Sequence, residues 1–258
     1  MSFPSSAALP QPAALAAWLR RLFGRGAAAQ LAPRPPFDAL HGVDTAGLIY
    51  AAGLPTGHPH DRHNEGYYAT APSLFAGAIA HWRQTLVGCS PQDYAFIDLG
   101  CGKGRVLLLA SELPFRSVVG IELDPQLARI AHRNVHRWLR RPRACRRITV
   151  ERGDVLDLQL PAGPVVLFLF NSFSADVLAP LMERLAAAAR QRSAPIDLIY
   201  VHPDHDRLIA RTPGVEILRR AEVPFSQEDV AADVFGVSSD CFYLYRFLTR
   251  SRTIRMEL

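Results

Sequence analysis

The stretch "IDLGCGKGR", residues 97–105, decides the fold of this chain. An apolar run reaches an acid, Asp98, and three glycines then alternate with other residues: Gly100, Gly102 and Gly104. Glycines between a strand and a helix tolerate positive φ and let a ligand approach the backbone closely. The first turn of the helix adds free N–H groups. The pattern predicts a buried strand, a ligand-binding loop and a helix.

Strand and helix patterns alternate on both sides of this loop, which is typical of a doubly wound α/β sheet. The fully apolar run at 164–170 predicts a central parallel strand, and the segments at 215–223 and 241–249 predict a terminal antiparallel pair. We expect the other strands at 94–100, 117–123, 147–154 and 196–203, and helices at 72–86, 104–113, 125–141 and 174–192.

Length and composition fit one large α/β domain with an extension. The chain has 258 residues, is 49% apolar and carries a formal charge of +5, which permits acidic partners without requiring them. Helical spacing of apolar residues at 15–22 predicts a short amphipathic helix, followed by a proline-rich linker. We expect helix and linker over 1–36, an N-terminal cap over 37–90 and the main domain over 91–258.

Targeting signals and cysteine chemistry are both weak in this sequence. No apolar run reaches the ~20 residues that span a bilayer, and the N-terminal apolar segment has no basic segment before it. Four cysteines lie far apart without a C-x-x-C pair, which argues against a zinc site and a disulfide framework. We expect buried thiols and a cytoplasmic protein.

Acids follow three consecutive predicted strands. Asp98 lies at the end of the first, Glu122 at the end of the second and Asp154 just after the third. Carboxyl ends of parallel strands face one crevice, where open α/β sheets bind ligands. Three acids suit a pyrophosphate poorly and a cation well, so a nucleoside that carries a sulfonium fits the crevice.

At these residues the sequence resembles the class I S-adenosylmethionine-dependent methyltransferases. "FIDLGCGKGR" is similar to their first motif, "VVGIELDP" to their second and "RGDVLDLQLP" to their third. The resemblance covers about residues 90–205. It implies a Rossmann-like, seven-stranded methyltransferase sheet with a terminal antiparallel hairpin, and S-adenosyl-L-methionine as the cofactor. An α/β domain that binds another nucleotide is the alternative.

The resemblance also implies roles for single residues in cofactor binding. It implies that the methionine part is surrounded by Asp98, Gly100, Gly102 and Gly104, the ribose by Glu122, and the adenine by Asp154 and Val155. Lys103, the only lysine in the chain, is expected to face solvent. A contact between Lys103 and the cofactor carboxylate is the alternative.

Substrate chemistry is expected after the fourth strand, in "NSFS" at 171–174. Asn171 and Phe173 are our candidates there, and a core role for Phe173 stays open. Asn-x-Phe before a helix is similar to the histone-lysine methyltransferases that lack a SET domain. Tyr67 and Thr70 in "GYYATAP" resemble the Tyr-x-x-Thr loop in which those enzymes bind the cofactor. The sequence most resembles a bacterial group of undefined substrate, which shows "GVDT" upstream, here at 42–45, and this resemblance leaves the acceptor open.

The resemblance implies a methyltransferase that acts on nitrogen of a protein side chain. RNA or small-molecule methylation is the alternative within enzymes, and a non-catalytic nucleoside-binding or nucleic-acid-binding module of the same fold is the alternative outside them. An arginine-rich segment follows the second strand; it fits a solvated helix face, or a footprint for nucleic-acid phosphates through Arg137, Arg140 and Arg141.

A histidine-rich segment, "HPHDRH" at 58–63, lies outside these motifs. Its spacing of His58, His60, Asp61 and His63 is able to bind a metal. A polar surface loop is the simpler interpretation, and the sequence assigns no metal.

Overall fold

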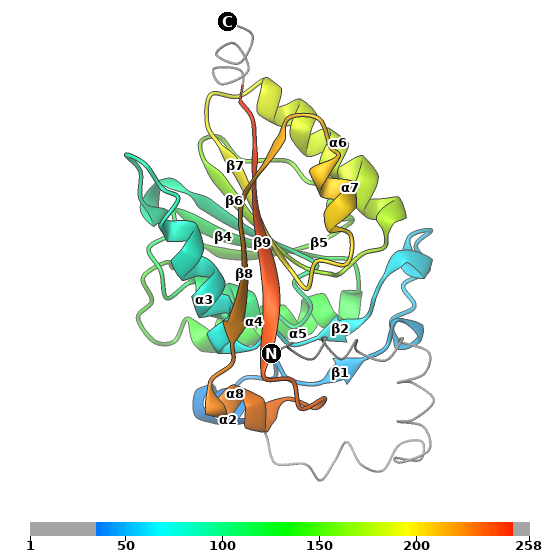
Figure 1. Ribbon diagram of the computed structural model, residues 1–258. Coiled ribbons are helices and arrows are strands. Elements are labelled where there is room, and N and C mark those ends of the chain that lie inside the picture. Colours follow the sequence, from blue (N-terminus) through cyan, green and yellow to red (C-terminus); the bar gives the residue numbers. More distant parts are fainter. Residues whose placement is uncertain (1–34, 250–258) are drawn as a thin grey trace, which may run out of the picture. The chain divides into compact units, whose positions relative to one another are not determined.

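The computed structural model describes residues 35–249, of which residues 36–249 belong to one compact unit. The helix expected at 15–22 lies outside the described residues, and the proposed domain boundaries stay a prediction. Within the described part, a seven-stranded sheet has the order β5-β4-β3-β6-β7-β9-β8 (Figure 1). Its strands are β3 (Ala95–Leu99), β4 (Ser117–Glu122), β5 (Ile148–Arg152), β6 (Val165–Phe170), β7 (Ile196–Val201), β8 (Val215–Pro224) and β9 (Ser239–Phe247).

Strand direction and order confirm the predicted fold class. β3 to β7 run parallel, whereas β9 pairs antiparallel with both β7 and β8. The chain moves outward from β3 through β4 to β5 and then returns to the other side of β3 with β6. This reversal creates a switch point between β3 and β6, and ligands of open α/β sheets bind at the carboxyl ends there.

Two layers of helices cover the sheet, because each of its faces is apolar. One core cluster joins the sheet to α3 (Pro72–Arg83), α4 (Arg105–Ala110) and α5 (Pro125–Trp138). The other joins it to α6 (Ala175–Arg190) and α7 (Asp206–Ala210). Figure 1 shows α3 and α6 on opposite sides of the sheet. All predicted strands and helices from residue 72 onward are present, with each end within three residues.

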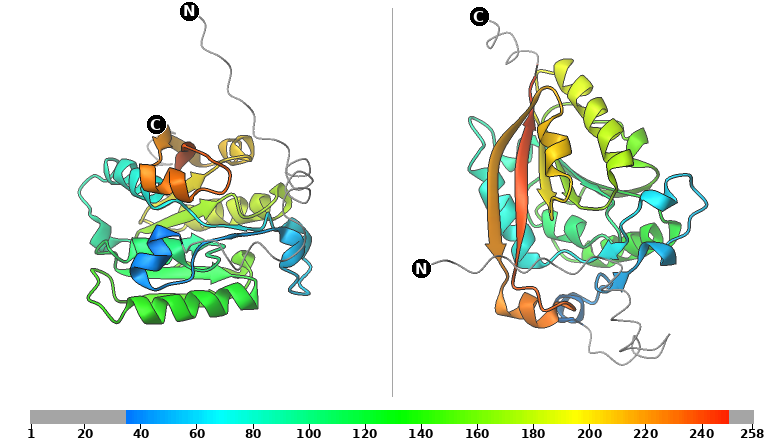
Figure 2. Two further views of the ribbon diagram at one scale, coloured as in Figure 1. Left: turned by 90° about the horizontal axis from the view of Figure 1, so that it is seen from below. Right: turned by 45° about the vertical axis from the view of Figure 1, so that its right-hand side comes forward.

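The segment before α3, residues 36–71, crosses the carboxyl ends of the parallel strands and is called the crossing segment below. It contains α2 (Pro36–His41) and a small antiparallel pair of β1 (Leu48–Ile49) with β2 (Tyr67–Tyr68). The left view in Figure 2 shows this blue-to-cyan segment in front of the strands. It therefore lies over the switch point.

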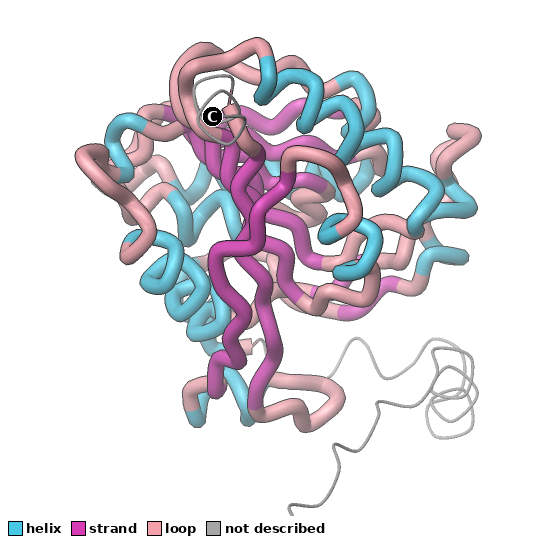
Figure 3. Tube along the Cα trace, turned by 45° about the horizontal axis from the view of Figure 1, so that its top comes forward, coloured by secondary structure: helices cyan, strands magenta, loops and turns pink. Residues whose placement is uncertain are grey.

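The β8–β9 pair carries α8 (Gln227–Ala232) at its connection (Figure 3). Just after α8, Asp233 accepts a hydrogen bond from the hydroxyl of Tyr68 in β2, which joins this end of the pair to the crossing segment. Among the described residues, no helix has both the length and the apolar character that crossing a membrane requires.

Candidate functional site

Two buried acids lie side by side at the centre of the crevice. Asp98 in β3 is 4% exposed, and Glu122 at the end of β4 is 8% exposed. Burial, with the neighbouring charge of Glu122, holds the pKa of Asp98 well above its usual range. Burial likewise raises the pKa of Glu122 to about 7. Two neighbouring desolvated carboxyls favour a ligand that brings positive charge or hydrogen-bond donors.

Glu122 also holds the glycine loop in place. Its Oε2 accepts from the backbone N–H of Gly102 at 2.7 Å, and its Oε1 accepts from that of Asp124 at 2.9 Å. Asp124 in turn caps α5 by accepting from two backbone N–H groups of its first turn. The ribose candidate of the sequence is therefore also the residue that shapes the loop.

The glycine loop has no room for side chains at two of its positions. Gly102 has φ of 53°, and a Cβ atom there would lie 2.2 Å from the ring of Tyr67. Gly100 has φ of 78°, and its Cβ atom would lie 2.9 Å from Ser172, beyond β6. The loop is thus enclosed between Tyr67 of the crossing segment and Ser172, which follows β6.

Tyr67 and Thr70 lie in the crossing segment beside this loop. The Tyr67 hydroxyl donates to the carbonyl of Thr45 at 2.5 Å, and burial raises the pKa of that hydroxyl. Thr70 is 4% exposed, and its carbonyl accepts from Nη1 of Arg105 at 3.3 Å. The structure places both residues at the loop, and their contact with a cofactor stays a prediction.

Lys103 does not face solvent as the sequence predicted. Its Nζ donates to Oδ1 of Asp44 at 2.9 Å and to the carbonyl of Ala46 at 2.8 Å, and the side chain is only 13% exposed. The buried amide of Asn134 on α5 fixes the same contact by donating to the carbonyls of Asp44 and Lys103. The sequence expectation failed because the crossing segment, 60 residues earlier, covers the loop.

Arg105, one residue after the third glycine, was missed by the sequence analysis. It is 8% exposed; its Nε donates to Oγ1 of Thr45 at 2.8 Å, and its Nη2 lies 3.5 Å from Oδ1 of Asp38. Asp38 also accepts from the backbone N–H groups of Thr45 and Ala46. A charged residue inside the apolar start of a helix is the one sequence signal that could have indicated this buried ion pair.

Asn171 is fixed at the end of β6. Its Oδ1 accepts from the hydroxyl of Tyr200 at 2.8 Å, and its Nδ2 donates to Oδ2 of Asp204 at 2.8 Å. Asn171 and His202 are the two non-glycine residues with positive φ within residues 35–249, and they follow the neighbouring strands β6 and β7. Backbone strain of this kind is typical of functional sites.

Phe173 is 8% exposed and belongs to the core on the α6 face. Its ring lies 3.4 Å from the position of a Cβ atom on Gly100. Phe173 also pairs through its backbone with Asn64 of the crossing segment. These contacts agree with the core alternative, and a catalytic role for Phe173 stays a prediction.

Carboxylates gather near Asn171. His202 lies with Nδ1 3.1 Å from Oδ1 of Asp240, and that hydrogen bond raises the pKa of His202. Asp204, which binds Asn171, lies 3.9 Å from the other nitrogen of His202. The carboxyl ends of β6 and β7 therefore bring together the amide of Asn171, a histidine and acids.

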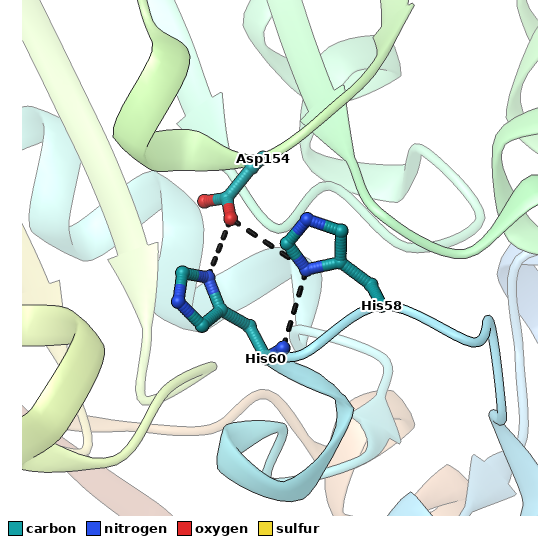
Figure 4. A group of neighbouring side chains, drawn as sticks. All are labelled: His58, His60 and Asp154. Atoms are coloured by element: carbon teal, nitrogen blue, oxygen red, sulfur yellow. Dashed lines mark hydrogen bonds and ion pairs between the residues drawn. The ribbon is translucent and has the colours of Figure 1, made fainter.

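The third acid meets the histidine-rich segment. Asp154 follows β5, and its Oδ1 accepts from the backbone N–H of Leu156 at 2.8 Å. Its Oδ2 lies 2.5 Å from Nδ1 of His60 and 3.8 Å from Nδ1 of His58 (Figure 4). Val155, the other adenine candidate, is 5% exposed. The sequence analysis did not connect these two segments.

Part of the chain is similar in sequence to known methyltransferases. A family model described as "Methyltransferase domain" matches residues 96–195, which span β3 to the loop before β7. The matched part of the chain therefore has the sequence pattern of a methyltransferase domain. A ribosomal protein L11 methyltransferase of Colwellia psychrerythraea is 29% identical over 116 residues, and the match covers 45% of this chain and 32% of that protein.

Solved structures of methyltransferases are also similar to the domain. An RNA methyltransferase from Salinibacter ruber, in complex with S-adenosyl-L-homocysteine, covers 69% of this chain and 93% of its own at 18% identity, with a TM-score of 0.42. A SAM-dependent methyltransferase from Leishmania major covers 67% and 72% at 12% identity, with a TM-score of 0.48. Similarity of this degree says nothing about the acceptor of this chain.

Proposed function

We propose that the methyltransferase domain binds S-adenosyl-L-methionine and transfers its methyl group to a nitrogen atom, with a protein side chain as the preferred acceptor. The observation that carries the proposal is the set of acids at the carboxyl ends of three adjacent strands, around a glycine loop. Two of them, Asp98 and Glu122, are buried beside each other and are suited to a cationic ligand. When bound, the cofactor supplies an electrophilic methyl group on a sulfonium.

The residues of the chain divide the cofactor between them in this proposal. Asp98 faces the ammonium of the methionine part, and the free lone pairs of Glu122 accept from the ribose hydroxyls. Asp154 accepts from the adenine amino group, beside the apolar Val155. Glycines let the loop backbone approach a ligand closely, and the ring of Tyr67 covers the loop at Gly102.

The acceptor nitrogen belongs at Asn171 in this proposal. Tyr200 and Asp204 hold the amide in one orientation, so it is able to orient an attacking nitrogen without further ordering. Asp204 and Asp240 favour an acceptor that arrives with positive charge. An amine must lose a proton before it attacks, and His202 is the neighbouring group that is able to take it.

RNA is the second candidate acceptor, and the exposed arginines of α5 and the following loop favour it. Arg137, Arg140 and Arg141 are all exposed, and Arg137 makes a single 3.3 Å hydrogen bond to the carbonyl of Gly42. The acids around Asn171 argue against a polyanion at the reacting end. A non-catalytic module of the same fold stays the alternative outside enzymes.

The first experiment measures cofactor binding and turnover separately. Isothermal titration with S-adenosyl-L-homocysteine tests the cofactor site, and labelled S-adenosyl-L-methionine in a nuclease-treated or protease-treated lysate identifies the acceptor class. Asn171→Ala is expected to lower labelling about 100-fold while the dissociation constant for S-adenosyl-L-homocysteine changes less than threefold. Asp98→Ala serves as the contrast, since this variant is expected to lose S-adenosyl-L-homocysteine binding itself. Equal loss of binding in both variants would place Asn171 in the cofactor site and contradict its acceptor role.

A further inference from the structure

We propose that His58, His60 and Asp154 form a binding site for one divalent transition-metal ion, with Zn²⁺ as the probe. One ligand atom from each residue lies within 4.8 Å of the other two. Figure 4 shows both imidazoles directed at the same carboxylate, from a loop more than 90 residues earlier in the chain. Imidazole and carboxylate together suit zinc and its first-row neighbours.

The hydrogen bonding of the His58 ring is suited to a metal. Its Nδ1 accepts a 3.2 Å hydrogen bond from the backbone N–H of His60, so this nitrogen carries a lone pair rather than a proton. The same nitrogen lies 3.8 Å from the negative Oδ2 of Asp154. Two acceptors that face each other repel, and a cation between them would turn this contact into an attraction.

The distances require only small movements of the three side chains. Tetrahedral zinc with bonds near ~2.1 Å holds its ligand atoms about 3.4 Å apart. Oδ2 of Asp154 lies 2.5 Å from Nδ1 of His60 and 3.8 Å from Nδ1 of His58. The first distance must open and the second must close, each by less than ~1 Å. At Nδ1 of His58, the ion would take the place of the 3.2 Å hydrogen bond from the backbone N–H of His60.

The loop that carries the histidines is fixed from both sides. Asp61 accepts from the backbone N–H groups of Thr56 and Gly57 at 2.7 and 2.8 Å, which closes the turn around His58. His63 bonds to Oγ of Ser174 at 2.9 Å, and its carbonyl accepts from the Ser174 backbone N–H. Because the chain is held before and after them, His58 and His60 lose little freedom on binding an ion.

The site is open to solvent on the histidine side. The side chains of His58 and His60 are 38% and 31% exposed, whereas that of Asp154 is 9% exposed. An ion therefore has a path to the carboxylate, and water completes its coordination. Three protein ligands with open positions are typical of exchangeable rather than closed structural zinc sites.

One consequence rests on the proposed function. Asp154 is the acid that we assign to the adenine amino group, so the ion and the cofactor draw on the same carboxylate. Each ligand is then expected to weaken the other by the same factor, as linkage requires. The histidine loop would couple metal binding to cofactor affinity.

The test measures the metal alone and uses the full chain. Titration calorimetry with Zn²⁺, and visible absorption with Co²⁺, are expected to give one site per chain. His58→Ala, His60→Ala and Asp154→Asn are each expected to weaken it at least about tenfold. His136→Ala is the control, because His132 and His136 form a separate exposed pair four residues apart on α5.

The possible outcomes separate this proposal from the proposed function. The metal site is overturned if Zn²⁺ does not bind one to one. It is also overturned if His58→Ala and His60→Ala leave binding intact and His136→Ala removes it. Repeating the titration with saturating S-adenosyl-L-homocysteine then tests the shared carboxylate. Metal binding that is unchanged by bound S-adenosyl-L-homocysteine overturns the coupling only. Failure of S-adenosyl-L-homocysteine to bind at all contradicts the proposed function and leaves the metal result standing.

Discussion

At the scale of single residues, Glu122 combines a structural role with the ribose-binding role that we propose for it. Both of its oxygens accept from backbone N–H groups, and its pKa is nevertheless raised to about 7 by burial. Since this pKa is raised above the usual value, the contribution of Glu122 to the free energy of unfolding is fully present below about pH 4.5. It is lost as the pH rises through about 7. A ligand that donates hydrogen bonds to the ionised carboxylate would offset that loss.

Cofactor affinity is therefore expected to depend on pH through Glu122. Ribose hydroxyls donate to the carboxylate, so binding favours its ionised form and releases a proton. With the free pKa near 7, the affinity for S-adenosyl-L-homocysteine should rise roughly tenfold between about pH 6 and pH 8. Calorimetry in two buffers of different ionisation enthalpy measures the released proton. Glu122→Gln is the control and should show neither the rise nor the release; a wild-type affinity that is flat over this range contradicts the assignment.

At the scale of elements, the glycine loop depends on what lies against it. Gly102 adopts positive φ and touches the Tyr67 ring, whereas Gly88 has positive φ with nothing within 4 Å of its Cβ position. An alanine at either position would therefore carry the same cost for a left-handed backbone, and only at position 102 would it also collide with the Tyr67 ring. This difference allows the packing of the crossing segment on the loop to be measured by itself.

Gly102→Ala is expected to destabilise the protein more than Gly88→Ala. Both pay ~1–2 kcal/mol for a left-handed backbone with a Cβ atom, and only Gly102→Ala displaces the buried Tyr67, which adds about 1–3 kcal/mol. Urea denaturation of the two variants gives the difference in free energy of unfolding. Gly102→Ala should also weaken S-adenosyl-L-homocysteine binding, while Gly88→Ala should not. Equal destabilisation of both would mean that Tyr67 does not pack on the loop in solution.

At the scale of the whole described unit, positive and negative charge lie in different places. A group of exposed arginines lies on α5 and the loop that follows it, whereas Asp204 follows β7 and bonds to Asn171, and Asp240 near the start of β9 bonds to His202. A protein acceptor with a basic side chain would use the acidic end, and RNA would use the arginines. The two acceptor classes therefore predict different salt dependence.

An RNA acceptor predicts a measurable role for the arginine face. Replacing Arg137, Arg140 and Arg141 with Gln should weaken binding of a single-stranded RNA and reduce the slope of log affinity against log salt by ~0.7 per lost contact. A control variant with Gln at Arg184, Arg190 and Arg211 removes the same charge from exposed positions elsewhere. If both triple variants bind RNA like the parent, the arginines form a solvated face, and the protein acceptor is favoured.

The sequence by itself determined the seven strands of the main sheet, the four longest predicted helices, the fold class and the positions of the strand-end acids. These features follow local rules, since a buried parallel strand needs a continuous apolar run and a strand-to-helix turn needs glycine. Asp98, Glu122 and Asp154 therefore lie where the pattern put them. Only the tertiary structure decided what covers them, because contacts between segments 60 to 94 residues apart leave no periodic signal. Such long-range packing encloses Lys103, pairs Arg105 with Asp38 and brings His60 to Asp154.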